Sequence, residues 1–210
     1  MPLSHLASID PAIPEGPTGP VMLLLHGYGS NERDLPGLTP YLPTLPWASV
    51  RAPLPMPGGG AAWFPLTLPS EPEQEPIDSA TALLWEWVDT HLDPHTPLVP
   101  VGFSQGGLMA LQLLRTRPER IAATVVLAGL VTDGPQPADA RLSEHPAPVF
   151  WGRGLADQVI WPAAIERMSA LLPTIADLSS HTYPGLGHGV DARMLSDVRT
   201  FLDQALAPRD

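Results

Sequence analysis

The chain has 210 residues with 28 prolines, a net charge of −11, no cysteine and no lysine. The length fits a single domain over residues 1–210, and the negative charge argues against a nucleic-acid or anionic-membrane partner. The missing cysteines exclude thiolate nucleophiles and cysteine-bound metals, and the missing lysines exclude Schiff-base chemistry. The N-terminus has no cationic region and no long apolar run, and nowhere are there 18 consecutive apolar residues, so we expect no stable membrane insertion and a cytoplasmic location.

Apolar runs that end in glycine-rich turns predict buried parallel strands along the chain. Five prolines among the first 20 residues exclude a helix there and permit at most one short edge strand around residues 3–9. The first strong run is 21–25, which ends in His-Gly-Tyr-Gly. Further strands are predicted at 48–50, 98–101, 123–127, 149–151 and 179–183.

Apolar residues at spacings of three and four predict helices between these strands. One is expected over residues 77–92, with Asp78 and Ser79 as caps near its start. Others are expected directly after Ser104 to about residue 115, over 163–172 and over 191–206. Alternating strands and helices predict a mostly parallel α/β sheet with helices on both faces. The segment 52–76, rich in proline and glycine, is predicted as one long loop.

Residues 102–106 read Gly-Phe-Ser-Gln-Gly, the G-x-S-x-G pattern, after a predicted strand and before a predicted helix. The pentapeptide alone is weak evidence, but this placement is typical of a turn that presents a nucleophilic serine. Such a turn strains the backbone of Ser104 and leaves no room for side chains two positions away, which explains Gly102 and Gly106. The alternative is a turn that serves packing alone.

A serine hydroxyl needs a base to remove its proton and an acid to orient that base. His188, in a glycine-flanked loop after the last predicted strand, is the predicted base; the alternative is a loop histidine without a chemical role. Asp157 and Asp133 each follow a predicted strand and are the candidate acids. We favour Asp157, because Asp133 is one strand further from the histidine loop.

An oxyanion hole needs two N–H donors. The amide of Gln105, directly after the serine, is the predicted first donor. The amide of Tyr28 is the predicted second, with Gly27 allowing the backbone to approach a ligand. His26 is expected to brace this loop by hydrogen bonds rather than to take part in chemistry.

From residue 21 to the C-terminus the chain resembles the phospholipase/carboxylesterase branch of the α/β-hydrolases, which includes acyl-protein thioesterases. The resemblance implies an α/β-hydrolase fold and hydrolysis of carboxylic esters or thioesters with no cofactor and no metal. It also implies a triad of Ser104, Asp157 and His188, with the amides of Tyr28 and Gln105 as oxyanion donors. The motifs that carry it are Gly-Phe-Ser-Gln-Gly-Gly at 102–107, Ala-Trp-Phe at 62–64, His-Gly-Tyr-Gly at 26–29, Ala-Asp at 156–157 and Gly-His at 187–188.

Two departures from the family pattern concern acyl specificity. The segment between Ala52 and Trp63 is shorter than the family's usual loop, and the chain has Ala128-Gly129 where the family pattern predicts Ser-Gly. Residues 129–147 are also too few for a cap domain. We therefore expect an open, shallow pocket lined by Met56, Trp63, Phe64, Leu66 and Trp161.

The predicted function is a serine carboxylesterase that hydrolyses small-molecule esters with short- to medium-chain acyl groups, through an acyl-enzyme. One alternative is a hydrolase of long acyl chains, similar to acyl-protein thioesterases or lysophospholipases. The other is a hydrolase-fold binding protein that has lost catalysis. The sequence gives no prediction of the oligomeric state.

Overall fold

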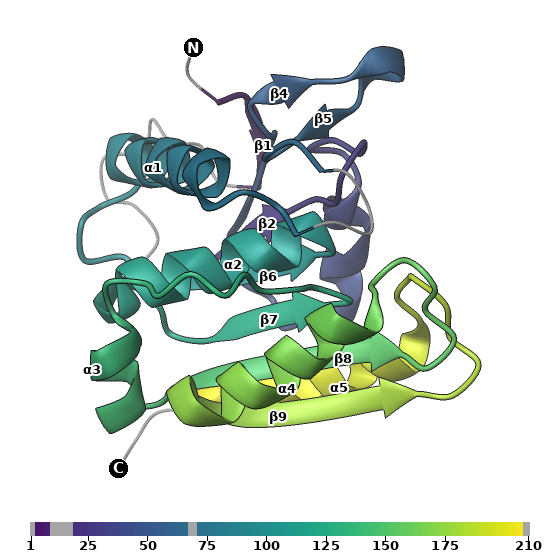
Figure 1. Ribbon diagram of the computed structural model, residues 1–210. Helices are drawn as coiled ribbons and strands as arrows, with labels where there is room; N and C mark the ends of the chain where they lie inside the picture. Colours follow the sequence, from purple (N-terminus) through teal and green to yellow (C-terminus); the bar gives the residue numbers. More distant parts are fainter. Residues whose placement is uncertain (1–2, 9–18, 67–70, 208–210) are drawn as a thin grey trace.

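The computed structural model describes residues 3–8, 19–66 and 71–207. A seven-stranded sheet with the order β1-β3-β2-β6-β7-β8-β9 runs through its centre (Figure 1). All neighbouring strands are parallel except β1 and β3. The six predicted parallel strands and the short edge strand near the N-terminus are confirmed. The strands are β1 (His5–Ala7), β2 (Val21–Leu25), β3 (Trp47–Val50), β6 (Leu98–Phe103), β7 (Thr124–Leu127), β8 (Ala147–Gly154) and β9 (Ala176–Tyr183).

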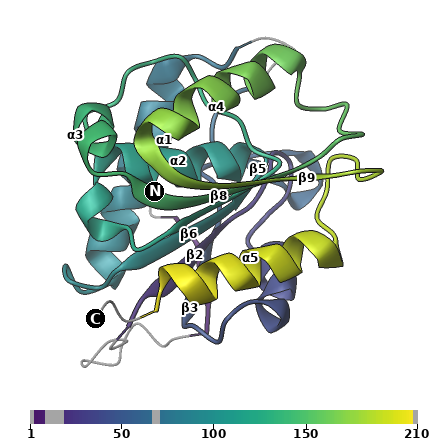
Figure 2. The ribbon, with the colours of Figure 1, turned by 90° about the horizontal axis from the view of Figure 1, so that it is seen from below.

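Helices cover both faces of the sheet, as predicted (Figure 2). Strand β2 shows why its sequence is an unbroken apolar run: Leu23 packs into the core on one face and Leu24 into the core on the other. One face carries α1 (Gln74–His91), α2 (Gln105–Thr116), α3 (Asp139–Glu144) and α4 (Pro162–Ile175), and the other carries α5 (Ala192–Ala205) and the 3-10 helix η1 (Leu35–Tyr41).

The prediction of one long loop over 52–76 is wrong. A small antiparallel hairpin forms there from β4 (Leu54–Pro55) and β5 (Ala61–Ala62), joined by the 3-10 turn η2 (Pro57–Gly59). Its two-residue strands are too short to show an alternating pattern. Residues 67–70 of the predicted loop lie outside the described residues.

Helix α1 begins at Gln74, earlier than predicted, and its N-cap is Glu73. Asp78 and Ser79 therefore lie inside the helix and are not caps. The helix includes Pro76 because the N–H groups of the first turn have no intrahelical acceptor, so a proline there costs no hydrogen bond.

Three short helices were not predicted: η1, α3 and the 3-10 helix η3 (Pro118–Arg120). Each has too few residues for a clear periodic pattern. Residues 129–147 contain only α3 and connecting turns, so this segment has no cap domain. No helix in the described ranges is long and apolar enough to span a membrane.

Candidate active site

The three predicted triad residues lie on loops at the carboxyl edge of the sheet. Ser104 follows β6, Asp157 follows β8 and His188 follows β9. Since these strands are parallel, their carboxyl ends meet at one edge, where sites in open α/β sheets form. The topology thus brings together side chains that are as many as 84 positions apart in the sequence.

Ser104 sits in a strained turn between β6 and α2. Its backbone has φ 55° and ψ −116°, a combination that residues other than glycine rarely adopt. A Cβ atom on Gly102 would overlap the carbonyl oxygen of Gly106, and one on Gly106 would overlap the carbonyl oxygen of Leu25. The predicted reason for both glycines is therefore confirmed.

Two hydrogen bonds link the three side chains in the order serine, histidine, aspartate. His188 Nε2 is 2.9 Å from Ser104 Oγ, and His188 Nδ1 is 2.8 Å from Asp157 Oδ2. A carboxylate can only accept, so Nδ1 carries the proton and Nε2 presents its lone pair to the serine hydroxyl. This is the tautomer that a general base for Ser104 requires.

The Asp157 carboxylate is fixed on its other side by backbone N–H groups. Its Oδ1 accepts from Val159 N at 2.8 Å and from Ile160 N at 3.1 Å, and its side chain is 3% exposed. These bonds orient the carboxylate toward His188 and compensate for its burial.

Asp133, the rival acid, lies in a different environment. Its side chain is 76% exposed and forms an ion pair with Arg167. Arg167 also pairs with Glu71 at 2.5 Å, so Asp133 belongs to a surface ion-pair network. The structure brings Asp157, and not Asp133, to His188.

The two predicted oxyanion donors belong to segments that lie beside Ser104. Gln105 is the first residue of α2, so its N–H has no acceptor within the helix. The loop with Tyr28 passes close to Ser104, because a Cβ atom on Gly27 would lie 3.4 Å from Ser104 Cβ. In the described part of the chain, neither the Tyr28 nor the Gln105 N–H has a backbone acceptor.

His26 is fully buried and braces this loop, as predicted. Its Nδ1–H donates to the carbonyl oxygen of Gly27 at 2.8 Å, and its Nε2 accepts from the N–H of Ala52 at 3.1 Å. Burial lowers the pKa of His26, which keeps the imidazole neutral in this arrangement.

The side chain of Gln105 ties the hairpin region to the serine turn. Its Oε1 accepts from Trp63 N at 2.8 Å and its Nε2 donates to the carbonyl oxygen of Phe64 at 2.7 Å. The indole Nε1 of Trp63 donates to the carbonyl oxygen of His26 at 2.9 Å. Only the backbone N–H of Gln105 was predicted to have a role. The role of its side chain was not predicted, because the sequence holds no local signal for it.

The five predicted pocket residues divide into two groups. Trp63 and Phe64 are each 1% exposed and pack in the core, so their prediction as pocket walls needs correction: they support the site from behind. Met56, Leu66 and Trp161 are partly buried, and the latter two pack against the same core. Their contact with substrate stays a prediction.

Exposed apolar side chains flank the triad on the neighbouring loops. Tyr28 is 44% exposed, Leu155 54% and Val159 40%. Tyr28 is on the predicted oxyanion loop, and the other two are on the loop that carries Asp157. Leu155 and Val159 were not predicted to lie near the site.

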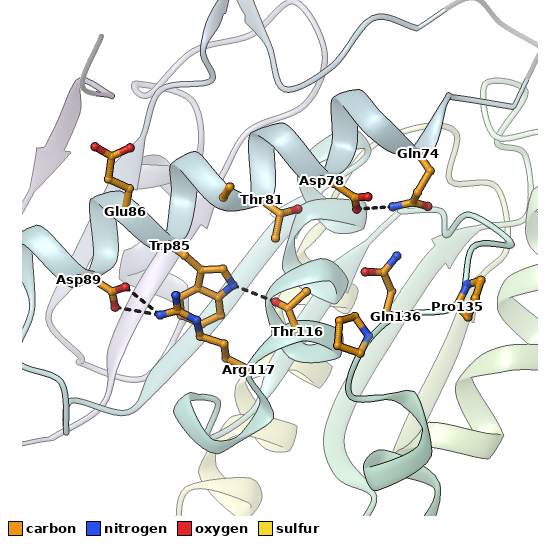
Figure 3. Close-up of a pocket in the computed structure, with 12 residues that line it drawn as sticks. Gln74, Asp78, Thr81, Trp85, Glu86, Asp89, Thr116, Arg117, Pro135 and Gln136 are labelled. Carbon is orange, nitrogen blue, oxygen red and sulfur yellow. Dashed lines mark hydrogen bonds and ion pairs between the residues drawn. The ribbon is translucent and has the colours of Figure 1, made fainter.

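A groove of about 710 Å³ lies away from this edge, between α1 and the end of α2 (Figure 3). Arg117 lies over the ring of Trp85 at 4.6 Å and pairs with Asp89, and Trp85 Nε1 donates to Thr116 Oγ1. None of the three triad residues lines this groove.

Comparisons with known proteins agree with the fold. The family model described as Phospholipase/Carboxylesterase matches residues 10–206. Acyl-protein thioesterase 1 of Debaryomyces hansenii is 26% identical over 162 residues, covering 72% of this chain and 68% of that protein. A pimeloyl-[acyl-carrier protein] methyl ester esterase of Aromatoleum aromaticum is 29% identical over 216 residues, covering 90% and 76%.

Solved structures share the architecture. The Bacillus cereus carboxylesterase superposes with a TM-score of 0.80 at 24% identity, covering 97% of this chain and 94% of that chain. Esterase PE8 superposes with a TM-score of 0.72 at 27% identity, covering 98% and 100%. The α/β-hydrolase fold expected from the sequence is confirmed.

Proposed function

We propose that Ser104, His188 and Asp157 carry out the reaction of this chain, which belongs to the phospholipase/carboxylesterase family and is a carboxylic ester hydrolase. Ser104 is the nucleophile, His188 the general base and then acid, and Asp157 the residue that orients His188. The observation that carries this assignment is the pair of hydrogen bonds, 2.9 Å from His188 Nε2 to Ser104 Oγ and 2.8 Å from His188 Nδ1 to Asp157 Oδ2.

The reaction has two halves. Ser104 Oγ attacks the ester carbonyl carbon while its proton passes to His188 Nε2, and His188 then protonates the leaving alcohol as the carbon–oxygen bond breaks. Water enters, gives its proton to His188 and attacks the acyl-enzyme, which releases the acid and restores Ser104. The carbonyl oxygen becomes negative in both halves, and the N–H groups of Tyr28 and Gln105 stabilise it.

Active-site labelling tests this assignment and separates an enzyme from an inactive binding protein. A fluorophosphonate probe should label the wild-type protein rapidly at Ser104, because only an activated hydroxyl reacts fast. Ser104→Ala should lose the rapid labelling and the hydrolysis of p-nitrophenyl butyrate while keeping the wild-type circular dichroism spectrum. Hydrolysis at the wild-type rate in this variant would contradict the covalent mechanism.

The proposed substrates are esters with short- to medium-chain acyl groups. The segment between β7 and β8 holds only α3, and the hairpin beside the site is short, so the described residues form no cap that encloses a long chain. Each methylene that the pocket buries adds about 0.8 kcal/mol, close to fourfold in kcat/KM, until its wall ends. In a p-nitrophenyl ester series below the micelle limit, we expect the maximum between about two and eight carbons, as this burial term loosely bounds it.

A long-chain thioesterase is the second candidate, because Debaryomyces hansenii acyl-protein thioesterase 1 is among the relatives. Matched oxygen esters and thioesters of two, four, eight and sixteen carbons distinguish the two. A maximum at palmitate would favour the long-chain function and contradict the open pocket.

The proposed mechanism uses no cofactor and no metal, so a chelator such as EDTA should leave kcat unchanged. Loss of activity with EDTA and its recovery with added metal would contradict this. The cytoplasmic location also stays a prediction, and cell fractionation tests it.

A further inference from the structure

A second arrangement of serine, histidine and aspartate lies on the edge strand β9 and the helix α5. Ser179 and His181 are two residues apart on β9, so their side chains share one face of the sheet, the face that α5 covers. Ser179 Oγ is 3.0 Å from His181 Nε2, and His181 Nδ1 is 3.5 Å from Asp197 Oδ2 on α5. The order hydroxyl, imidazole, carboxylate is the same as in the triad.

The surroundings of His181 hold its ring and favour one tautomer. The imidazole stacks on the ring of Phe150 with 5.2 Å between centroids and an angle of 17° between planes. Tyr183 donates its hydroxyl proton to the same Asp197 oxygen at 2.8 Å. The carboxylate 3.5 Å from Nδ1 favours a proton on Nδ1, which leaves the Nε2 lone pair to accept from the Ser179 hydroxyl. This is the tautomer needed to take a proton from Ser179.

A groove of about 350 Å³ opens beside Ser179, with room for a small acyl group. Its walls are mixed: Leu178 and Phe201 offer apolar surface, and Gln204 offers an amide. Pro148, Asp177, Ala205 and Ala207 complete the lining.

The two serines differ in what lies around the attacked carbonyl. Ser104 precedes a helix N-terminus, so an N–H points to where the oxyanion forms. Ser179 lies within a paired strand, opposite Phe150 on β8. In a strand the amides lie in the plane of the sheet while the side chain stands perpendicular to it, so the neighbouring N–H groups point away from an acyl group on Oγ. Ser179 therefore has a base but no oxyanion donors of this kind.

We propose that Ser179 is a second acyl acceptor, which His181 activates toward esters with good leaving groups and which does not turn over. Ser179 Oγ attacks the carbonyl carbon of an aryl ester, and its proton passes to His181 Nε2. The bond from that carbon to the aryl oxygen breaks, the aryl oxide leaves with the electron pair, and His181 returns its proton to water. The acyl group stays on Ser179, because hydrolysis of an alkyl ester without oxyanion stabilisation is slow.

The composition of the chain makes this site easy to test. With no lysine and no cysteine, the side chains that most often capture active esters are missing. The experiment treats Ser104→Ala protein with p-nitrophenyl acetate and locates acetyl groups by peptide mass spectrometry. We expect Ser179 to be acetylated, about tenfold or more faster than in the double variant Ser104→Ala/His181→Gln, as positioned general bases provide at least this factor.

Ser180 supplies a matched control, since it is the next residue on β9 and its side chain is exposed. Ser180→Ala in the Ser104→Ala background should leave the acetylation rate of Ser179 unchanged. Absence of acetyl from Ser179, or the same rate after His181→Gln in a protein with the parent circular dichroism spectrum, would overturn the proposal. Either result leaves rapid labelling of Ser104 in the wild type unaffected, so failure here is distinct from failure of the proposed esterase mechanism.

Discussion

Two neighbouring strands of the sheet are each followed by a non-glycine residue with positive φ. Strand β6 is followed by Ser104 with φ 55°, and β7 is followed by Ala128 with φ 47°. In the described part of the chain, these are the non-glycine residues with positive φ. Each donates its N–H to the next strand at 2.8 Å, Ser104 to Leu127 and Ala128 to Gly152.

The comparison separates what the fold provides from what the side chain provides. The strained strand end occurs twice, so it belongs to the way these strands pass into the next segment. Of these two residues, only Ser104 places a hydroxyl against an imidazole. Ala128 is 1% exposed and carries no functional group. Positive φ is therefore not itself a mark of a nucleophile, and the hydrogen bond to His188 distinguishes Ser104 from Ala128.

The largest expected difference between the two strand ends is in catalysis. Ser104→Ala should lower kcat on the order of 10⁵- to 10⁶-fold, as removal of the nucleophile does in other triads. Ala128→Gly should leave kcat within about twofold, since Ala128 makes no polar side-chain contact. Steady-state kinetics on p-nitrophenyl butyrate measure both, and equal losses would remove the distinction.

The two candidate acids extend the comparison to the loops after β7 and β8. Asp157→Asn should lower kcat on the order of 10⁴-fold, because the amide favours the wrong imidazole tautomer. Asp133→Asn should change kcat less than about threefold, since an exposed ion pair contributes little. The opposite ranking would assign the acid to Asp133.

The residues that follow the two turns also differ, Gln105 after one and Gly129 after the other. Gln105→Leu leaves the Trp63 N–H and the Phe64 carbonyl without their partner, which costs about 1–3 kcal/mol for each buried group. We expect a lower urea midpoint and about tenfold lower kcat, because β5 also binds the oxyanion loop through Gly29 N–H to the carbonyl oxygen of Ala61 at 2.9 Å.

Gln112 on the same helix is the matched control, because its side-chain amide is buried and has no partner among the described residues. Gln112→Leu should keep kcat and should not lower the urea midpoint. A loss of kcat as large as that in Gln105→Leu would show that any disturbance of α2 lowers kcat, and that the hydrogen bonds from Gln105 to Trp63 and Phe64 are not the cause.

A smaller effect concerns the strain itself. Glycine adopts positive φ without the penalty of about 1–2 kcal/mol that other residues pay, and loses about half of this gain to its greater freedom when unfolded. Ala128→Gly should therefore raise the free energy of unfolding by up to about 1 kcal/mol. Ser104→Gly should likewise be more stable than Ser104→Ala, and a decrease in either comparison would show that these turns are unstrained.

The smallest expected effect is a pH dependence of stability from the brace beside the serine turn. Burial lowers the pKa of His26, so below about pH 6.5 the unfolded chain binds a proton that the folded protein does not. Stability should fall as the pH falls through this range, and His26→Gln should show a shallower fall between pH 7 and 5 in urea denaturation. An identical slope in both proteins would contradict a neutral, buried His26.

Local patterns in the sequence predicted the parts of the molecule that local physics determines. Apolar runs identified the strands, and Gly102 and Gly106 identified the turn around Ser104. The start of α1 was missed, because Pro76 is tolerated in a first turn, and the hairpin was missed, because its strands have two residues each.

Contacts between distant residues account for the rest of the site. The tie from Gln105 to Trp63 spans 42 positions, and nothing near either residue in the sequence predicts it. Trp63 was accordingly placed in the pocket, whereas it packs behind the site. The choice between Asp157 and Asp133 also needed the structure, since the chain order Ser, Asp, His fits both.

The hairpin formed by β4 and β5 has a base that is hydrogen-bonded to the oxyanion loop and a tip with open space around it. At its base, Ala61 pairs with both Gly29 and Ser30 of the oxyanion loop, while at the tip a side chain on Gly58 or Gly59 would meet nothing within 4 Å. Gly58 and Gly59 have φ values of 76° and 84°, which favour glycine, so insertions that keep these two glycines change the tip without touching the proposed triad. Tips of different length can therefore be grafted at residues 57–59 to test whether this part of the hairpin affects the substrate range while the reaction stays the same.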